Sequence, residues 1–134
     1  MIDSGGDHTG LGRWSWYLVE GKPGHRTYIM PAYAPCGNAG LGTSRKKGLK
    51  MNPKTMFQED TLAVLRRWQE KGDRVVLIMD ANKHVMDGSM CKQLAGEDLQ
   101  MRDAVNSETK SPGPKTCFRS SEPIDGICKK SILQ

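Results

Sequence analysis

The chain has 134 residues, which is the length of one ordinary domain with a modest core. Lysine and arginine number 20 against 15 acidic residues, a formal net charge of +5. This charge fits a phosphate-bearing partner, and it equally fits a mildly basic soluble surface. The N-terminus is polar and no apolar run nears about 18 residues, so no signal peptide or membrane-spanning helix is expected, and a cytoplasmic or nuclear location is predicted.

The cysteines are Cys36, Cys91, Cys117 and Cys128. No two of them are spaced as C-x-x-C, and no histidine stands at the distance that a zinc finger requires, so we do not expect a zinc site. We expect reduced thiols, as in most intracellular proteins.

The first predicted element is a β-hairpin. Apolar side chains alternate with others from Trp14 to Val19, which is typical of a strand. "GKPG" at 21–24 supplies turn-forming residues, and a second strand is expected from Thr27 to Tyr33. Pro31 lies inside this second strand and predicts an edge position, a bulge or an early end, because proline donates no backbone hydrogen bond.

A segment rich in glycine and lysine follows, from 36 to 54, without any periodicity. It contains the most basic stretch of the chain, which consists of Arg45, Lys46, Lys47 and Lys50. We expect a surface loop here. A loop that contacts phosphates and a solvated linker would both have this composition.

A helix and a buried strand are expected next. Thr55 and Gln58 fit a capping box, and Gly72 is suited to end the helix. The apolar stripe of the helix consists of Leu62, Leu65 and Trp68. The near-continuous apolar run from Arg74 to Met79 predicts a strand covered on both faces. Helix, short turn and buried strand together predict a layered α/β fold.

The patterns are weaker in the rest of the chain. We expect a short helix over 86–94, another turn or two of helix over 98–105, and a loop over 107–115. Residues 116–120 and 124–128 are candidates for short strands. No internal repeat is present.

Asp80 and Asn82 directly follow the predicted strand and are candidate site residues. A carboxylate at Asp80 can accept a proton or bind a hard cation, and the amide of Asn82 can bind a phosphate oxygen or a metal. Ligands in layered α/β proteins gather at the carboxyl ends of strands. The alternative is an Asx-turn, in which both side chains only cap the local backbone.

Two further candidates lie elsewhere in the chain. Asp125 stands in an apolar stretch, where a partly buried acid would need a histidine, an arginine or a metal as its partner. Pro123 and Gly126 also fit a simple turn around it. Tyr33 ends the second predicted strand, and a half-buried structural tyrosine is the alternative to a functional one.

The order of these elements carries more information than any one of them. A hairpin that leads to Y-x-P, an amphipathic helix, an apolar strand ending in D-x-N and then "PIDGI" resembles the endonuclease/exonuclease/phosphatase superfamily. Its members include deoxyribonuclease I, apurinic endonucleases and the endonuclease domains of non-LTR retroelements. "GLGRWSW", "GDRVVLIMDAN" and "RSSEPIDGI" carry the resemblance, which extends from Gly10 to Ile127.

The resemblance implies an α/β (α+β) fold, a partial four-layer β-sandwich with flanking helices of the deoxyribonuclease I type. It also implies hydrolysis of phosphate esters with Mg²⁺ or Mn²⁺, with Asp80 and Asn82 as metal-binding residues. Asp80 would activate or orient the attacking water, and Asn82 would hold the scissile phosphate. Tyr33 would contact that phosphate, and Asp125 would orient a catalytic histidine.

Parts of the family pattern have no counterpart that we can find in this sequence. The family's first strands carry an Asn and a metal-binding Glu, and no comparable strand is expected before Trp14. The family's last strand carries Ser-Asp-His, whereas this chain ends in "KKSILQ". His8, His25 and His84 do not fit the catalytic position. We therefore expect 1–134 to form a single, partial domain.

These observations predict a truncated metal-dependent phosphoesterase that acts on phosphodiesters of nucleic acid, with DNA as the favoured substrate. Activity of the isolated chain is expected to be weak or absent, because losing one member of a catalytic set is costly in rate. One alternative is a non-catalytic remnant that binds phosphate or nucleic acid. Another is a partial gene product with open strand edges and an exposed half-core.

Overall fold

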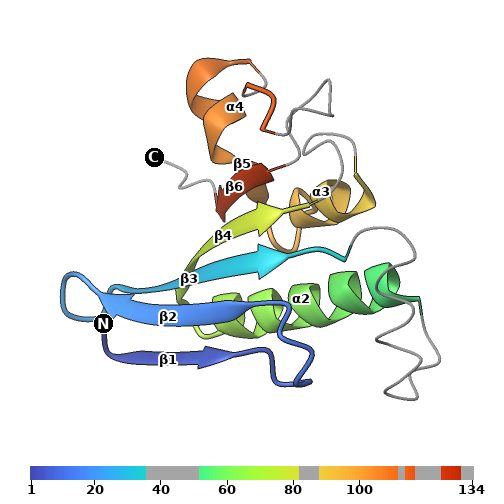
Figure 1. Cartoon of the computed structure of the whole chain (residues 1–134). Helices are drawn as coiled ribbons and strands as arrows, with labels where there is room; N and C mark the ends of the chain where they lie inside the picture. Colours follow the sequence, from blue (N-terminus) through green and yellow to red (C-terminus); the bar gives the residue numbers. More distant parts are fainter. Residues whose placement is uncertain (36–51, 82–87, 112–113, 117–124, 131–134) are drawn as a thin grey trace.

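The structure is a computed structural model that describes residues 1–35, 52–81, 88–111, 114–116 and 125–130 (Figure 1). Within these residues, six strands form one sheet in the order β1-β2-β3-β4-β6-β5. The strands are β1 (Asp3–Gly6), β2 (Ser15–Glu20), β3 (Arg26–Tyr33), β4 (Arg74–Asp80), β5 (Met101–Asp103) and β6 (Asp125–Lys130). The helices are α2 (Pro53–Glu70), α3 (Ser89–Leu94) and α4 (Ala104–Thr109).

The sheet combines an antiparallel meander with one parallel crossover. β1, β2 and β3 pair antiparallel in chain order, whereas β3 and β4 are parallel. α2 lies between β3 and β4 in the chain and provides the long return that parallel strands require. β6 pairs antiparallel with both β4 and β5 and lies between them. The predicted mixed α/β fold is therefore confirmed.

The predicted hairpin is confirmed as β2 and β3, but its proline has a different position from the one expected. β3 is a central strand that continues through Pro31 to Tyr33, so the expected edge position and early end are wrong. Pro31 lies where the β2–β3 ladder is interrupted, next to an isolated bridge between Trp14 and Ala32. A strand tolerates a residue without an N–H at such an interruption.

β1 precedes this hairpin, in a segment where the sequence indicated no particular element, and it carries neither the Asn nor the Glu of the family's first strands. It pairs with β2 over its whole length, although all four of its residues are exposed. Its sequence, Asp-Ser-Gly-Gly, has no apolar alternation and low strand propensity, so no sequence pattern predicts this strand. Gly5 is required at its position, because a Cβ there would come within 2.5 Å of the Trp16 ring.

α2 begins earlier than the predicted capping box. The Asn52 side chain accepts a hydrogen bond from the Lys54 N–H at 2.9 Å, and Pro53 is the first helical residue. Asn52 is therefore the N-cap in place of Thr55, because asparagine before proline satisfies the helix start one turn earlier. The end of the helix agrees with the sequence, since Gly72 follows with a φ of +80°.

The apolar stripe of α2 packs against one face of the sheet (Figure 1). Trp68 stacks on Tyr28 of β3 with ring centroids 4.0 Å apart, and Trp16 of β2 meets both rings edge-on. Such aromatic pairs each stabilise by about 1 kcal/mol beyond the area that they bury. The stripe of Leu62, Leu65 and Trp68 is buried as predicted.

Among the residues that the structure describes, β4 is covered on one face only. Val75, Leu77 and Met79 are buried toward α2, whereas Ile78 between them is 42% exposed. The predicted cover on both faces is therefore wrong, because a continuous apolar run does not by itself reveal whether its second face is covered. In the described part of the chain, no second layer lies over the sheet face opposite α2, which we call the open face.

The second half of the chain differs from its sequence patterns at 98–105. The expected helix is the short strand β5 followed directly by α4, which lies beyond the β5–β6 edge of the sheet (Figure 1). Asp103 caps α4 by accepting a hydrogen bond from the Asn106 N–H at 2.7 Å. α4 also extends into the segment expected to be a loop. The helix predicted over 86–94 is represented by α3, and the strand over 124–128 by β6.

Some predictions lie outside the described residues. They include the basic stretch at 45–50, Asn82, His84 and most of the strand expected over 116–120. Among the residues that are described, no helix has both the length and the apolar character needed to cross a lipid bilayer.

A buried charge network joins the N-terminal loop to α2. Arg13 Nε donates to Asp7 Oδ2 at 2.7 Å, and its Nη2 donates to Asp60 Oδ2 at 2.7 Å. The Arg13 side chain is 8% exposed and that of Asp7 is fully covered. Burial alone would raise the pKa of Asp7, but hydrogen bonds from Arg13 and Thr9 outweigh it and hold the pKa well below its ordinary value.

We expect Asp7→Asn to lower the free energy of unfolding by about 3 kcal/mol at neutral pH, because it leaves a buried Arg13 with fewer anionic partners. Since folding lowers the pKa of Asp7, its stabilisation is complete above the ordinary value of 3.8 and is lost as the pH falls toward the folded value. The difference in the free energy of unfolding between the Asp7→Asn variant and the wild type should therefore become smaller at acidic pH.

Urea unfolding between pH 7 and pH 3 measures this difference, with the exposed Asp3→Asn as the control. A difference that stays constant across the range would show that the Asp7 carboxylate does not stabilise the network.

Candidate functional site

Strand register brings three of the four predicted site residues into one row. Tyr33 ends β3, Asp80 ends β4 and Asp125 begins β6. Tyr33 pairs with Asp80 across the parallel ladder, and Asp80 pairs with Asp125 across the antiparallel one. Paired Cα atoms in sheets are about 5 Å apart. We call these three residues the rim row. The fourth residue, Asn82, lies outside the described part of the chain.

The side chains of the rim row project from the open face. Opposed residues on neighbouring strands point to the same side of a sheet, and the preceding residue, Met79, points into the core on the other side. Tyr33 is 52% exposed, Asp125 is exposed and Asp80 is partly buried. A ligand can therefore reach all three residues from solvent.

Backbone hydrogen bonds hold the strand ends that carry the rim row. The Tyr33 N–H donates to the Arg13 carbonyl at 2.8 Å, and the Ala34 N–H donates to the Asp80 carbonyl at 2.9 Å. The Asp125 N–H, at the start of β6, donates to the Thr116 hydroxyl at 3.2 Å. Since Arg13 also belongs to the buried charge network, that network supports the end of β3.

The rim row has the charge and the donor atoms of a cation site. Two carboxylates directly opposite each other repel, and Mg²⁺ takes hard oxygen ligands, often one or two carboxylates together with waters and substrate oxygens. Asp80 and Asp125 fit this donor set. Within the described residues, no three His, Cys, Asp or Glu side chains form a cluster, so a cation here would rely on waters, Asn82 or the substrate for its other ligands.

The histidine that the resemblance implies beside Asp125 is not found in the described part of the chain. The ring centroids of His8 and Trp14 are 6.0 Å apart, and His25 lies in the turn between β2 and β3. Neither residue belongs to a strand that pairs with β6. The proposed partnership of Asp125 with a histidine therefore has no support among these residues.

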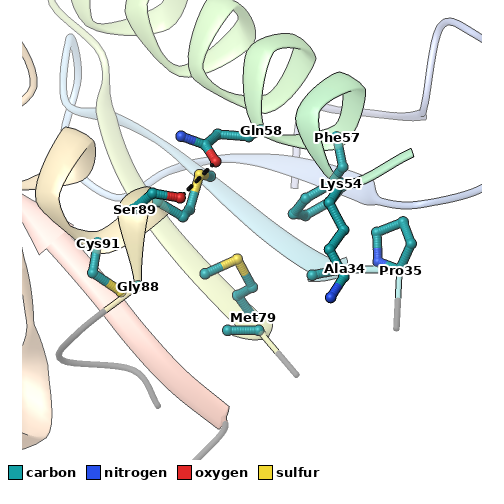
Figure 2. Close-up of a pocket in the computed structure, with 11 residues that line it drawn as sticks. Ala34, Pro35, Lys54, Phe57, Gln58, Met79, Gly88, Ser89 and Cys91 are labelled. Atoms are coloured by element: carbon teal, nitrogen blue, oxygen red, sulfur yellow. Dashed lines mark hydrogen bonds between the residues drawn. The ribbon is translucent and has the colours of Figure 1, made fainter. Parts of the chain in front are cut away.

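A pocket lies behind the rim row, on the side of the sheet that faces α2 (Figure 2). Met79 of β4, Lys54 of α2 and Cys91 of α3 contribute to its mostly apolar lining. A hydrogen bond of 3.0 Å from Ser89 Oγ to Gln58 Oε1 joins α3 to α2 at its wall. Sequence patterns did not indicate this pocket, because its lining comes from four separate segments and contains no local motif.

Cys128 of β6 does not supply a nucleophile. Its side chain is buried, and desolvation raises the pKa of its thiol to about 12. A thiol with such a pKa stays protonated at neutral pH, whereas reactive cysteines are thiolates.

The catalytic domain of human Nocturnin, solved with a bound sulfate anion, has a similar fold. The TM-score is 0.62 at 16% sequence identity, and the match covers 87% of this chain and 40% of that chain. The chain thus spans less than half the length of this neighbour. No protein-family model matches the sequence, and no curated protein matches it. The comparison establishes the fold, which is mixed α/β and of the deoxyribonuclease I type, as the sequence predicted.

We expect Asp125→Asn to raise the stability by about 0.5 kcal/mol or less when divalent cations are absent, because it removes one of two opposed carboxylates. Mg²⁺ should stabilise the wild type more than the variant, since a ligand that binds the folded state raises its stability. Urea unfolding in EDTA and then in millimolar Mg²⁺ measures both effects. Asp3→Asn is the matched control, and an equal response of wild type and Asp125→Asn to Mg²⁺ would argue against a shared cation.

Proposed function

We propose that this chain is a metal-dependent phosphoesterase that hydrolyses phosphodiester bonds of nucleic acid, with weak activity in isolation. The rim row is the observation that supports this proposal most. An exposed phenol stands beside two carboxylates where β3 and β4 end, in a fold of the deoxyribonuclease I type. One phosphate group bound there would have a hydrogen-bond donor, a proton acceptor and cation ligands within reach.

Hydrolysis of a phosphodiester needs a positioned water, a cation on the phosphate oxygens and donors for the developing charge. We assign Asp80 to accept a hydrogen bond from the attacking water and so to orient it. Tyr33 donates its hydroxyl hydrogen to a phosphate oxygen. Asn82, two residues beyond β4, is assigned to the scissile phosphate.

Asp80, Asn82 and Asp125 are the residues that would hold Mg²⁺ or Mn²⁺. When bound, the ion supplies positive charge to the phosphate oxygens. Asp125 is assigned to the cation because it pairs directly with Asp80. This role replaces the one that the resemblance implies for Asp125, which is to orient a catalytic histidine. The described residues place no histidine beside Asp125.

Nucleic acid is the substrate class that the charge of the chain favours. The formal net charge is +5, and Lys and Arg side chains gain affinity for nucleic acid by releasing its counterions. The Nocturnin domain was solved with sulfate, a tetrahedral anion like phosphate, so a related fold accommodates this shape. DNA is the substrate that we would test first.

A second candidate function is binding of nucleic acid without hydrolysis. It is favoured by the incomplete catalytic set, because the described residues place two carboxylates and no histidine in the rim row. Binding of this kind would fall steeply with salt and would not require Mg²⁺.

Nicking of supercoiled plasmid tests the proposal. We expect slow, Mg²⁺-dependent conversion to the open circle at micromolar protein. Asp80→Ala should reduce the rate by about 100-fold, because it removes the group that orients the water. Tyr33→Phe should reduce it less, since it removes one hydrogen-bond donor. Asp3→Ala, on β1 and outside the rim row, is the matched control and should leave the rate unchanged.

Nicking that persists unchanged in Asp80→Ala would overturn the assignment of the rim row. Absence of nicking together with salt-sensitive, Mg²⁺-independent binding to the same plasmid would favour the second candidate.

A further inference from the structure

Lys54, near the start of α2, differs from the other lysines in the described part of the chain. The others are all exposed, whereas Lys54 is half-buried. Its backbone N–H donates to the side chain of Asn52, but none of the ion pairs among the described residues involves its ammonium group. A charge that is partly removed from water and has no counter-ion is unfavourable. The position of Lys54 is therefore suited to an anion that comes from outside the chain.

The pocket behind the rim row surrounds the Lys54 side chain with uncharged groups. Of the described side chains that line it, only that of Lys54 is charged, and Phe57, Met79 and Met90 are among the apolar ones. Its volume is about 70 Å³, roughly half that of a cavity of ~150 Å³ that takes benzene. The pocket therefore has room for a group about as large as a phosphate and not for a nucleobase. Its apolar walls strengthen the attraction between the ammonium group and an anion.

The pocket adjoins the strand ends that carry the rim row. Ala34 follows Tyr33 and Ala81 follows Asp80 in the sequence, and both alanines line the pocket. The Ala34 N–H donates to the Asp80 carbonyl at 2.9 Å, which holds the two strand ends together. The Lys54 side chain runs from α2 toward Ala34 (Figure 2). The rim row and Lys54 thus flank the same strand ends from the two sides of the sheet.

This position distinguishes Lys54 from a lysine that only covers apolar surface. A lysine can lay its stem on apolar side chains and keep its ammonium group in water at many places on a protein. Lys54 does so at the carboxyl ends of β3 and β4, where ligands of layered α/β folds bind. It also places a positive charge near the two carboxylates of the rim row, which by themselves would repel a phosphate.

We propose that Lys54 binds a phosphate of the nucleic-acid strand next to the phosphate that lies at the rim row. Each strand of a duplex carries a phosphate about every 3.4 Å along the helix axis, so a strand that crosses the strand ends presents phosphates to both sides of the sheet. The compact ammonium group of lysine on its flexible stem suits such a contact. This inference rests on the proposed function, because it takes the rim row as the place of the scissile phosphate.

Binding of a fluorescently labelled DNA duplex to the full chain, measured by fluorescence anisotropy in EDTA, tests the proposal without hydrolysis. Lys54→Met removes the charge and keeps an unbranched side chain in the pocket. One lysine–phosphate contact contributes about 0.9 to the slope of log affinity against log salt concentration. We expect the slope of the variant to be smaller by this amount. Between about 50 and 200 mM salt, the wild type should therefore lose about threefold more affinity than the variant.

Lys71→Met is the matched control, because Lys71 is exposed at the other end of α2, and it should leave the slope unchanged. Urea unfolding provides a second readout. Lys54→Met should be at least as stable as the wild type, since it removes a charge that has no ion-pair partner among the described residues. Loss of stability together with an unchanged slope would assign Lys54 to the fold and overturn the proposal.

The role of Lys54 and the proposed hydrolysis fail in different ways. A reduced slope in Lys54→Met without any nicking of plasmid supports binding by Lys54 and argues against hydrolysis. Nicking that depends on Asp80, with equal slopes for Lys54→Met and the wild type, overturns the role of Lys54 and keeps the hydrolysis. Equal slopes together with stabilisation of the wild type alone by inorganic phosphate would assign Lys54 to a free anion and overturn the proposal. A wild type that does not bind the duplex would overturn it as well.

Discussion

β3 and β4 run parallel because α2 carries the chain back across one face of the sheet between them. Parallel strands end at the same edge, so Tyr33 and Asp80 meet although 47 positions in the sequence separate them. β6 pairs antiparallel, and for this reason its first residue, Asp125, joins the row. If β4 ran the other way, Asp80 would lie at the far end of the sheet and no row would form.

The elements that sequence patterns predict well are those with a strong local signal. The alternation after Trp14 and the stripe ending in Trp68 each identify one element without help from the rest of the chain. β1 and β5 have no such signal, because they are short and exist only through pairing with β2 and β6. The N-cap at Asn52 is a smaller miss, since two residues near the helix start each fit a capping pattern.

The candidate site depends on register, which local patterns do not reveal. A slip of one residue in β4 or β6 would turn Asp80 or Asp125 to the opposite face. The resemblance gives the order of the site residues, and the pairing of Asp80 with both Tyr33 and Asp125 places them together. The apolar run of β4 likewise does not reveal which faces of the strand are buried. Ile78 is as apolar as its buried neighbours and yet faces the open side of the sheet.

β1 forms one edge of the sheet, and its residues bury little surface. Its amide protons should therefore exchange with deuterium well before those of the central strands. Gly5 leaves room for the indole of Trp16 against this edge. Detachment of β1 from β2 would therefore expose the Trp16 ring to water and shift its fluorescence to longer wavelength. The sheet thus carries its own optical probe of local opening at the N-terminal edge.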